Sequence, residues 1–261
     1  LNLFLGFLNL IPIGSLDGGN LLRSIIWYVS GSKNKGRNFL NKLTLVLSIL
    51  VFSFGIICLF SFNFYYGLLL IFLGLFGINS SKSENQFFKI ENILKFSKVS
   101  DLKLKPLKKI EFNSNFVELN NVLKNKKGNQ DKYIFLTNSG RWDGFIEDKI
   151  LKSVSIKKWD RTLVGEFKKP INKFIRVKSS TELWRVIEKI ENTNEGFVLV
   201  INSADIPLGI IDRNKIGYFV FNKLGLNLPP NLISKFNNKN HYPLGIELPR
   251  IVKLMKKKGD I

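Results

Sequence analysis

The stretch NLIPIGSLDGGNLLR, residues 9–23, places a carboxylate at the edge of an otherwise apolar run. A charge at lipid depth is costly unless it is paired, hydrogen-bonded or bound to a metal. Pro12 and the pair Gly18 and Gly19 would interrupt a continuous helix around Asp17. In a membrane, such a break is tolerated only where protein or a water-filled cavity surrounds it. The stretch therefore predicts a functional site on a broken membrane helix.

The neighbouring sequence indicates a multi-pass membrane protein. Residues 43–81 contain no Asp, Glu, Lys or Arg. We expect two spans there, 43–62 and 64–78, because a helix needs about 20 apolar residues to cross a bilayer. A basic loop is predicted at 30–42, with Arg23 as an anchor at the membrane interface. By the positive-inside rule, the loop and the basic tail after residue 81 both face the cytoplasm.

The composition argues against several other functions and site types. The net charge of +20 comes from scattered basic residues, with no basic arm or helix, so we expect no nucleic-acid binding. The single cysteine, Cys58, lies in an apolar span, which excludes a disulfide framework and a cysteine-based zinc site. The single histidine is His241, far along the tail. Because the chain opens at Leu1 with no signal-peptide pattern, we expect it to be the C-terminal part of something longer.

The tail contains a repeat. Residues 107–151 and 171–219 share one order: strand (KIEF, FIRV), polar helix cap, helix, strand (YIFLT, FVLVI), turn, strand (GFI, GII) and closing helix. The caps expected are Asn113–Ser114 and 179–181. Apolar residues at helical spacing follow each cap. Along each repeat, these helical segments alternate with segments that have the pattern of strands. The repeat predicts two stacked α+β units that share a core.

The string NLIPIGSLDGG resembles the second motif of the site-2 protease family of intramembrane zinc metalloproteases, and the repeats resemble a tandem pair of CBS modules. The resemblance implies a multi-pass α-helical membrane domain followed by a soluble α+β tandem CBS-type module. Residues 1–81 would be the C-terminal part of the protease domain and 82–99 a linker. Residues 100–222 would be the CBS pair, divided into 100–160 and 161–222, with a C-terminal tail at 223–261.

The resemblance also implies roles for single residues. Asp17 would be the third Zn²⁺ ligand, Asn9 a catalytic residue that positions substrate, and Pro12, Gly18 and Gly19 would shape the break. The sequence has no HExxH, the motif that supplies the other two ligands and a glutamate base, so its ligand set is incomplete. We expect the chain to be inactive as given, with the HExxH half outside it. From the residues alone, Asp17 could equally be a helix N-cap, and Asn9 a helix–helix hydrogen-bonding residue.

The expected partners follow from the same resemblance. They are a membrane-spanning protein substrate and the lipid bilayer, and the CBS pair allows a homodimer. CBS modules that bind adenosine use a Thr or Ser and an Asp after the third strand. Here Glu147 and Ile150, then Asp212 and Lys215, stand at those places, so we expect no adenine nucleotide. The alternative function is a non-catalytic, membrane-anchored CBS regulator or scaffold; a CBS-gated transporter has less support, because too few spans are present.

Overall fold

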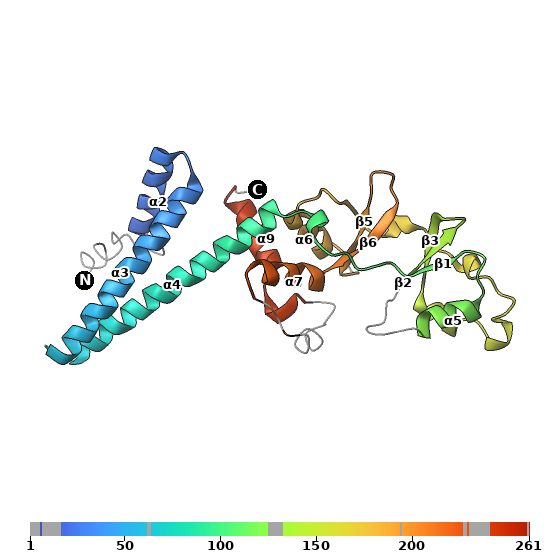
Figure 1. Ribbon diagram of the computed structural model, residues 1–261, viewed down its shortest axis with the longest axis horizontal. Coiled ribbons are helices and arrows are strands. Elements are labelled where there is room, and N and C mark those ends of the chain that lie inside the picture. The colour runs from blue at the N-terminus through green and yellow to red at the C-terminus, as the bar shows by residue number, and fades with distance from the viewer. Residues whose placement is uncertain are drawn as a thin grey trace. The chain divides into compact units, whose positions relative to one another are not determined.

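The computed structural model describes residue 6 and residues 17–61, 64–124, 133–193, 195–226, 229, 241–259 and 261. The chain forms two compact units, Leu1–Ile90 and Glu91–Ile261 (Figure 1). The first unit is helical, and the second mixes helices with two small sheets. The predicted order, long apolar helices followed by an α+β region, is confirmed.

Three helices are described in the first unit: α2 (Asp17–Ser30), α3 (Lys33–Ser61) and α4 (Phe64–Phe96). Helices α3 and α4 are both long and apolar enough to cross a membrane, with mean hydropathies of 2.7 and 1.5 over their most apolar windows. Only 22% of each window is buried, whereas the core helix of a soluble domain would be mostly buried. Both helices extend beyond the predicted spans at 43–62 and 64–78.

The predicted basic loop at 30–42 is wrong for most of its length. Only Gly31 and Ser32 separate α2 from α3, and the basic residues that follow form the first turns of α3. Lysine and arginine are good helix formers, so an apolar helix can start several turns outside its apolar part. Gly36 lets α2 come close, because a Cβ there would lie 2.9 Å from the carbonyl oxygen of Arg23.

Glycines hold α3 and α4 together. A Cβ at Gly67 would lie 2.5 Å from the backbone nitrogen of Leu59, and one at Gly74 would lie 2.6 Å from the Cβ of Phe52. Nearer the start of α3, the hydroxyl of Ser81 donates to the carbonyl oxygen of Asn41 at 3.0 Å. Small residues at a helix interface let two backbones approach, which is how helices associate without a hydrophobic driving force.

The segment predicted as a linker, 82–99, is helical over most of its length, because α4 continues to Phe96. Leu94 near its end is fully buried in the second unit. The chain then docks on the second repeat: the Leu183 amide donates to the Ser97 carbonyl, and the Val99 amide to the Thr181 carbonyl. This part of the chain is therefore structured rather than loose.

The second unit contains two three-stranded sheets of one topology. In each, the first strand pairs parallel with the second, and the second pairs antiparallel with the third. The first sheet has β1 (Lys109–Glu111), β2 (Tyr133–Asn138) and β3 (Arg141–Glu147). The second has β4 (Arg176–Lys178), β5 (Phe197–Ile201) and β6 (Pro207–Asp212). The predicted repeat of strand, helix, strand and strand is confirmed.

The repeated helices are α5 (Phe116–Lys124) and α6 (Leu183–Glu191), and their predicted caps are wrong. The Asn115 side chain accepts from the Glu118 amide and caps α5. Glu182 precedes α6 without a side-chain cap bond, because the Ser97 carbonyl accepts from Leu183 there. The closing helices also differ: the second repeat ends in α7 (Arg213–Lys223), but the first has only a 3-10 helix at Asp148–Lys152.

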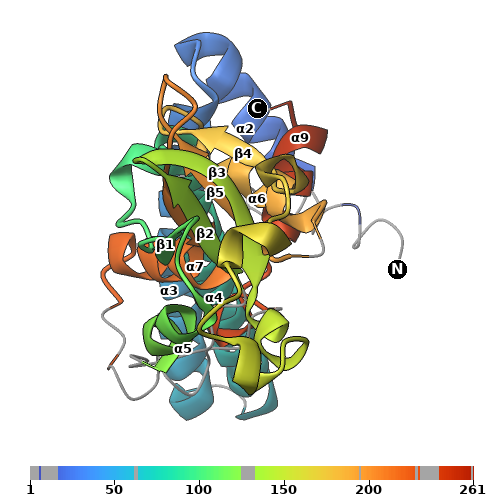
Figure 2. The ribbon, with the colours of Figure 1, turned by 90° about the vertical axis from the view of Figure 1, so that its right-hand side faces the viewer.

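Apolar clusters lie within the first repeat and between the two repeats. The first packs α5 against the first sheet. The second combines side chains of both sheets: Leu107, Tyr133, Phe135, Phe145, Phe174, Leu199 and Ile201. Figure 2 shows the green strands of the first sheet in front of the orange strands of the second. The two repeats thus share one core, as predicted.

The C-terminal segment, predicted as a tail at 223–261, carries a helix that belongs to the fold. Helix α9 (Leu248–Lys257) packs on α6 and buries Leu248, Ile251, Val252 and Met255. Lys256 forms an ion pair with Glu188 of α6. Further short 3-10 helices lie at Val99–Asp101, Ile156–Lys158, Val164–Phe167, Ile171–Lys173 and Pro243–Gly245.

We predict that Gly74→Leu destabilises the hairpin of α3 and α4 by about 1–3 kcal/mol or more, because the added side chain would collide with the backbone of Phe52. The midpoint of SDS-induced unfolding, followed by the helical circular dichroism signal in detergent, measures the effect. Ser53→Leu is the matched control, since Ser53 is exposed on α3. Equal midpoints for the two variants would contradict the close packing.

Candidate functional site

Asp17 is the first residue of α2, and its side chain is exposed. Gly18 and Gly19 directly after it are buried. A carboxylate at this position lies next to the free amides of the first helical turn and is favoured by the helix dipole. Among the described residues, no hydrogen bond to the Asp17 side chain is seen.

The other two residues of the predicted site, Asn9 and Pro12, lie outside the described residues. The structure brings together Asp17, Gly18 and Gly19 at one helix start, and their predicted roles stay predictions. Within the described ranges, no group of three or more His, Cys, Asp or Glu side chains could hold a metal ion. Catalytic zinc takes three protein ligands, so Asp17 alone does not hold one.

An ion pair fixes the helix that carries Asp17. Arg23 of α2 donates from Nη2 to Oε1 of Glu84 on α4, at 2.7 Å, and both side chains are less than a third exposed. Lys33 lies over the ring of Trp27, 4.9 Å from its centroid, and ties the end of α2 to the start of α3. We predicted Arg23 as an interface anchor and missed its partner. The available signal was that Glu84 is the next acidic residue after Asp17 in the sequence.

Aromatic rings fill the shared core between the two repeats. Phe174 stacks against Phe145 and Phe197 with centroids 4.6 and 5.4 Å apart, and Tyr133 meets all three rings. The Tyr133 hydroxyl donates to the carboxylate of Glu195. Burial and this carboxylate raise the pKa of Tyr133 above its ordinary value. A protonated phenol therefore links the two repeats at every physiological pH.

The four residues that were compared above with adenosine-binding positions make contacts within the second unit. Glu147 pairs with Lys169 at 2.8 Å, and Ile150 packs against the first apolar cluster. The Asp212 side chain accepts from the Lys215 amide at 2.8 Å and caps α7. The structure thus shows each of these groups in use within the fold.

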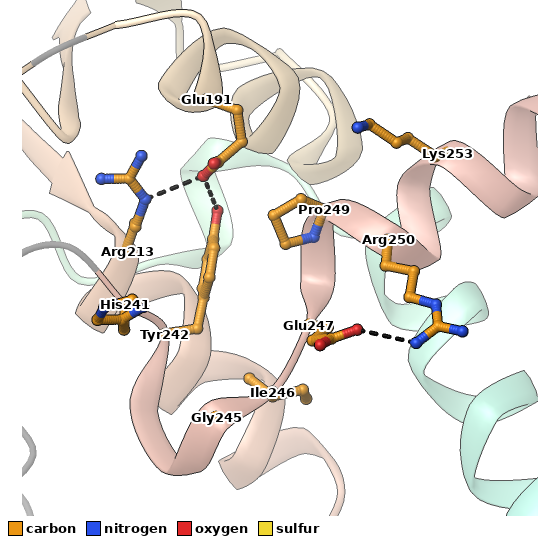
Figure 3. A pocket seen from close by; sticks show the side chains of 10 residues that line it. All are labelled: Glu191, Arg213, His241, Tyr242, Gly245, Ile246, Glu247, Pro249, Arg250 and Lys253. Carbon is orange, nitrogen blue, oxygen red and sulfur yellow. Dashed lines mark hydrogen bonds and ion pairs between the residues drawn. The ribbon is translucent and has the colours of Figure 1, made fainter.

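A pocket of about 480 Å³ lies between α6, α7 and the segment 241–253 (Figure 3). Tyr242 points toward Glu191, and its hydroxyl donates to Oε1 of that carboxylate at 3.3 Å. The same oxygen accepts from Nε of Arg213 at 2.9 Å. Glu247 and Arg250 form a second pair at 3.2 Å. Glu191 of α6 thus bonds both to Arg213 of α7 and to Tyr242, and the bond to Tyr242 holds the C-terminal segment on the second repeat.

Residues 1–52 match the family described as peptidase family M50. The resemblance predicted from the motif is confirmed. A relative from Synechocystis sp., provisionally named a zinc metalloprotease, is 22% identical over 219 residues, which cover 83% of this chain. The match covers 57% of the relative, so the chain spans little more than half of its length.

Solved structures similar to this chain are CBS proteins. The CBS domain of the bacterial CNNM/CorC family Mg²⁺ transporter is 12% identical, covers 62% of this chain and 94% of its own, and has a TM-score of 0.43. A crystal structure of CBSX2 in complex with AMP is 18% identical, covers 48% of this chain and 96% of its own, and has a TM-score of 0.38.

We predict that Arg23→Glu and Glu84→Arg each destabilise the helical unit, because each leaves two like charges facing one another where an ion pair stood. The double exchange should recover most of the loss, with a coupling energy of about 1–2 kcal/mol. SDS-induced unfolding in detergent measures both effects. If the stability lost by the double variant equals the sum of the losses of the two single variants, the two residues are not coupled. The ion pair would then not hold α2.

A second prediction concerns alkaline pH. Burial and the charge of Glu191 raise the pKa of Tyr242 above its ordinary value of 10. This raised pKa contributes stability that is present below pH 10 and is lost as pH rises toward the folded-state pKa. Tyr242→Phe should cost about 0.5–1.5 kcal/mol at neutral pH, and the difference from wild type should shrink above pH 10.

Urea unfolding followed by tryptophan fluorescence measures this difference, because Trp142, Trp159 and Trp184 all lie in the second unit. Tyr28→Phe is the control, since Tyr28 is 91% exposed. A difference between wild type and Tyr242→Phe that stays constant through pH 11 would show that Tyr242 ionises alike in both states.

Proposed function

We propose that this chain is the C-terminal part of an intramembrane zinc metalloprotease that cleaves membrane-spanning proteins. One observation carries the proposal: the NxxPxxxLDGG string presents an exposed carboxylate, Asp17, at the start of a helix beside two apolar helices. The match of residues 1–52 to peptidase family M50 supports it. Such a carboxylate next to a helix break is a suitable zinc ligand, since zinc accepts aspartate oxygens.

Asp17 would supply one zinc ligand, whereas a catalytic zinc needs three protein ligands. The sequence has no HExxH, and its single histidine lies in the second unit. We infer that these 261 residues do not cleave substrate alone, and that the remaining ligands and the general base come from another part of the protein. Arg23 and Glu84 have a supporting role in this proposal: their ion pair sets the position of the helix that carries Asp17.

The second unit is proposed to serve as a regulatory or protein-contact module on the cytoplasmic side. The buried aromatic core and the paired side chains at Glu147 and Asp212 support a role that does not depend on an adenine nucleotide. The runner-up function is a non-catalytic, membrane-anchored CBS regulator or scaffold. It is favoured by the absence of HExxH from the sequence.

The test uses the full reading frame of the gene, purified in detergent, with Asp17→Ala beside wild type. Asp17→Ala should lower zinc affinity by more than about a hundredfold, because even the loss of an outer-shell partner costs about 10–100-fold. Cleavage of a reconstituted membrane-spanning substrate should be lost with the metal. Asn20→Ala is the matched control, since Asn20 is exposed one turn along the same helix.

The outcomes separate the two functions. Zinc binding by wild type and by Asn20→Ala, with loss of metal and cleavage in Asp17→Ala, supports the protease. Full zinc content and cleavage in Asp17→Ala would contradict the role of Asp17. A wild-type protein that binds no zinc supports the non-catalytic regulator.

A further inference from the structure

The charges of the helical unit are one-sided. Residues 1–90 contain seven basic side chains, at positions 23, 33, 35, 37, 42, 82 and 89, and two acidic ones, Asp17 and Glu84. None of them lies in the uncharged stretch 43–81. Residues 62 and 63, between α3 and α4 in the sequence, carry no charge, and they are followed by Phe64, Tyr65 and Tyr66.

Contacts within the unit bring the basic residues to one end of the helix hairpin. The Arg37 guanidinium lies over the ring of Phe88, 5.0 Å from its centroid, and Ser81 bonds to Asn41. The start of α3 and residues 81–89 of α4 are therefore at the same level. The pairs Arg23–Glu84 and Lys33–Trp27 bring the C-terminal half of α2 to this level as well.

The side chains at this end are suited to a headgroup layer. Lys33, Lys35, Lys42, Lys82 and Lys89 are exposed, and Arg37 is half-buried. Trp27 is 46% exposed and Tyr28 is 91% exposed, next to the basic residues. Tryptophan and tyrosine favour the interface between lipid and water, and basic side chains near it are attracted to anionic lipid by about 1 kcal/mol each.

We propose that the basic end of the helical unit binds the headgroups of anionic phospholipids through Lys33, Lys35, Arg37 and Lys42. The inference rests on the proposed function in one respect, the insertion of α3 and α4 in a bilayer. The occupant is a lipid headgroup rather than a nucleic acid, because the basic residues directly adjoin the apolar part of α3 and lie beside exposed aromatic rings. Glu84, the acidic residue among positions 18–90, is engaged by Arg23.

The experiment reconstitutes the full 261-residue chain in phosphatidylcholine vesicles, and measures the association of spin-labelled phosphatidylglycerol and spin-labelled phosphatidylcholine by electron spin resonance. The wild-type chain should prefer phosphatidylglycerol at least about fivefold, the factor for one basic residue that engages a headgroup. High salt should reduce the preference, because exposed charges are screened.

The test variant replaces Lys33, Lys35, Arg37 and Lys42 with glutamine, which keeps helix propensity. We expect its preference to fall clearly below the wild-type value, with the remainder due to Lys82 and Lys89. The matched control replaces Lys149, Lys152, Lys157 and Lys158 of the second unit with glutamine, and should keep the wild-type value. Both sets remove four exposed or half-buried basic residues within ten positions, so net charge changes equally. A third variant with arginine at 33, 35 and 42 should also keep the preference.

Three outcomes overturn the inference: no preference in wild type, an equal loss in the test and control variants, or a test variant whose preference equals that of wild type. If the chain fails to insert in phosphatidylcholine vesicles and is removed by alkaline carbonate, the bilayer insertion in the proposed function fails as well. Insertion without a lipid preference contradicts this inference alone.

Discussion

The lack of water inside a bilayer is the constraint on which the helical unit depends. Backbone amides and carbonyls at that depth must pair within the chain, which permits helices and disfavours open loops. Helices α3 and α4 satisfy this demand, and Gly67 and Gly74 let their backbones approach where no hydrophobic effect would drive them together. The charged residues are pushed to the helix ends for the same reason, so the ion pair of Arg23 and Glu84 forms outside the uncharged stretch.

The second unit differs from the helical unit, because it buries its apolar side chains in its own core and excludes water from it. Two repeats of one topology place Phe145, Phe174 and Phe197 in a common aromatic cluster. Polar groups at its edge are paired: Tyr133 with Glu195, and Lys173 with Glu195 at 3.3 Å. The two halves of the unit are thereby joined across a common core.

Together these features give the proposed function a physical basis. Asp17 remains exposed at a helix start, while the glycines after it are buried and Arg23 is tied to α4. A metal ligand needs such a fixed supporting helix, because small displacements of a ligand weaken the site. The basic end of the unit adds an attachment to lipid headgroups near the same helix. The position of α2 is then set by protein contacts and by the membrane surface.

The sequence alone determined the two apolar helices and the repeated strand and helix order, because each rests on local periodicity. It also supplied Asp17 as a candidate site residue, through its motif. Only the tertiary structure decided the partner of Arg23, the course of residues 30–42 and the caps of α5 and α6. Those features depend on residues far apart in the chain. Glu84 is 61 positions from Arg23, and the Ser97 carbonyl that receives the Leu183 amide comes from the segment after α4. A local sequence pattern does not show which distant group will pair with a donor or acceptor that the local structure leaves unpaired.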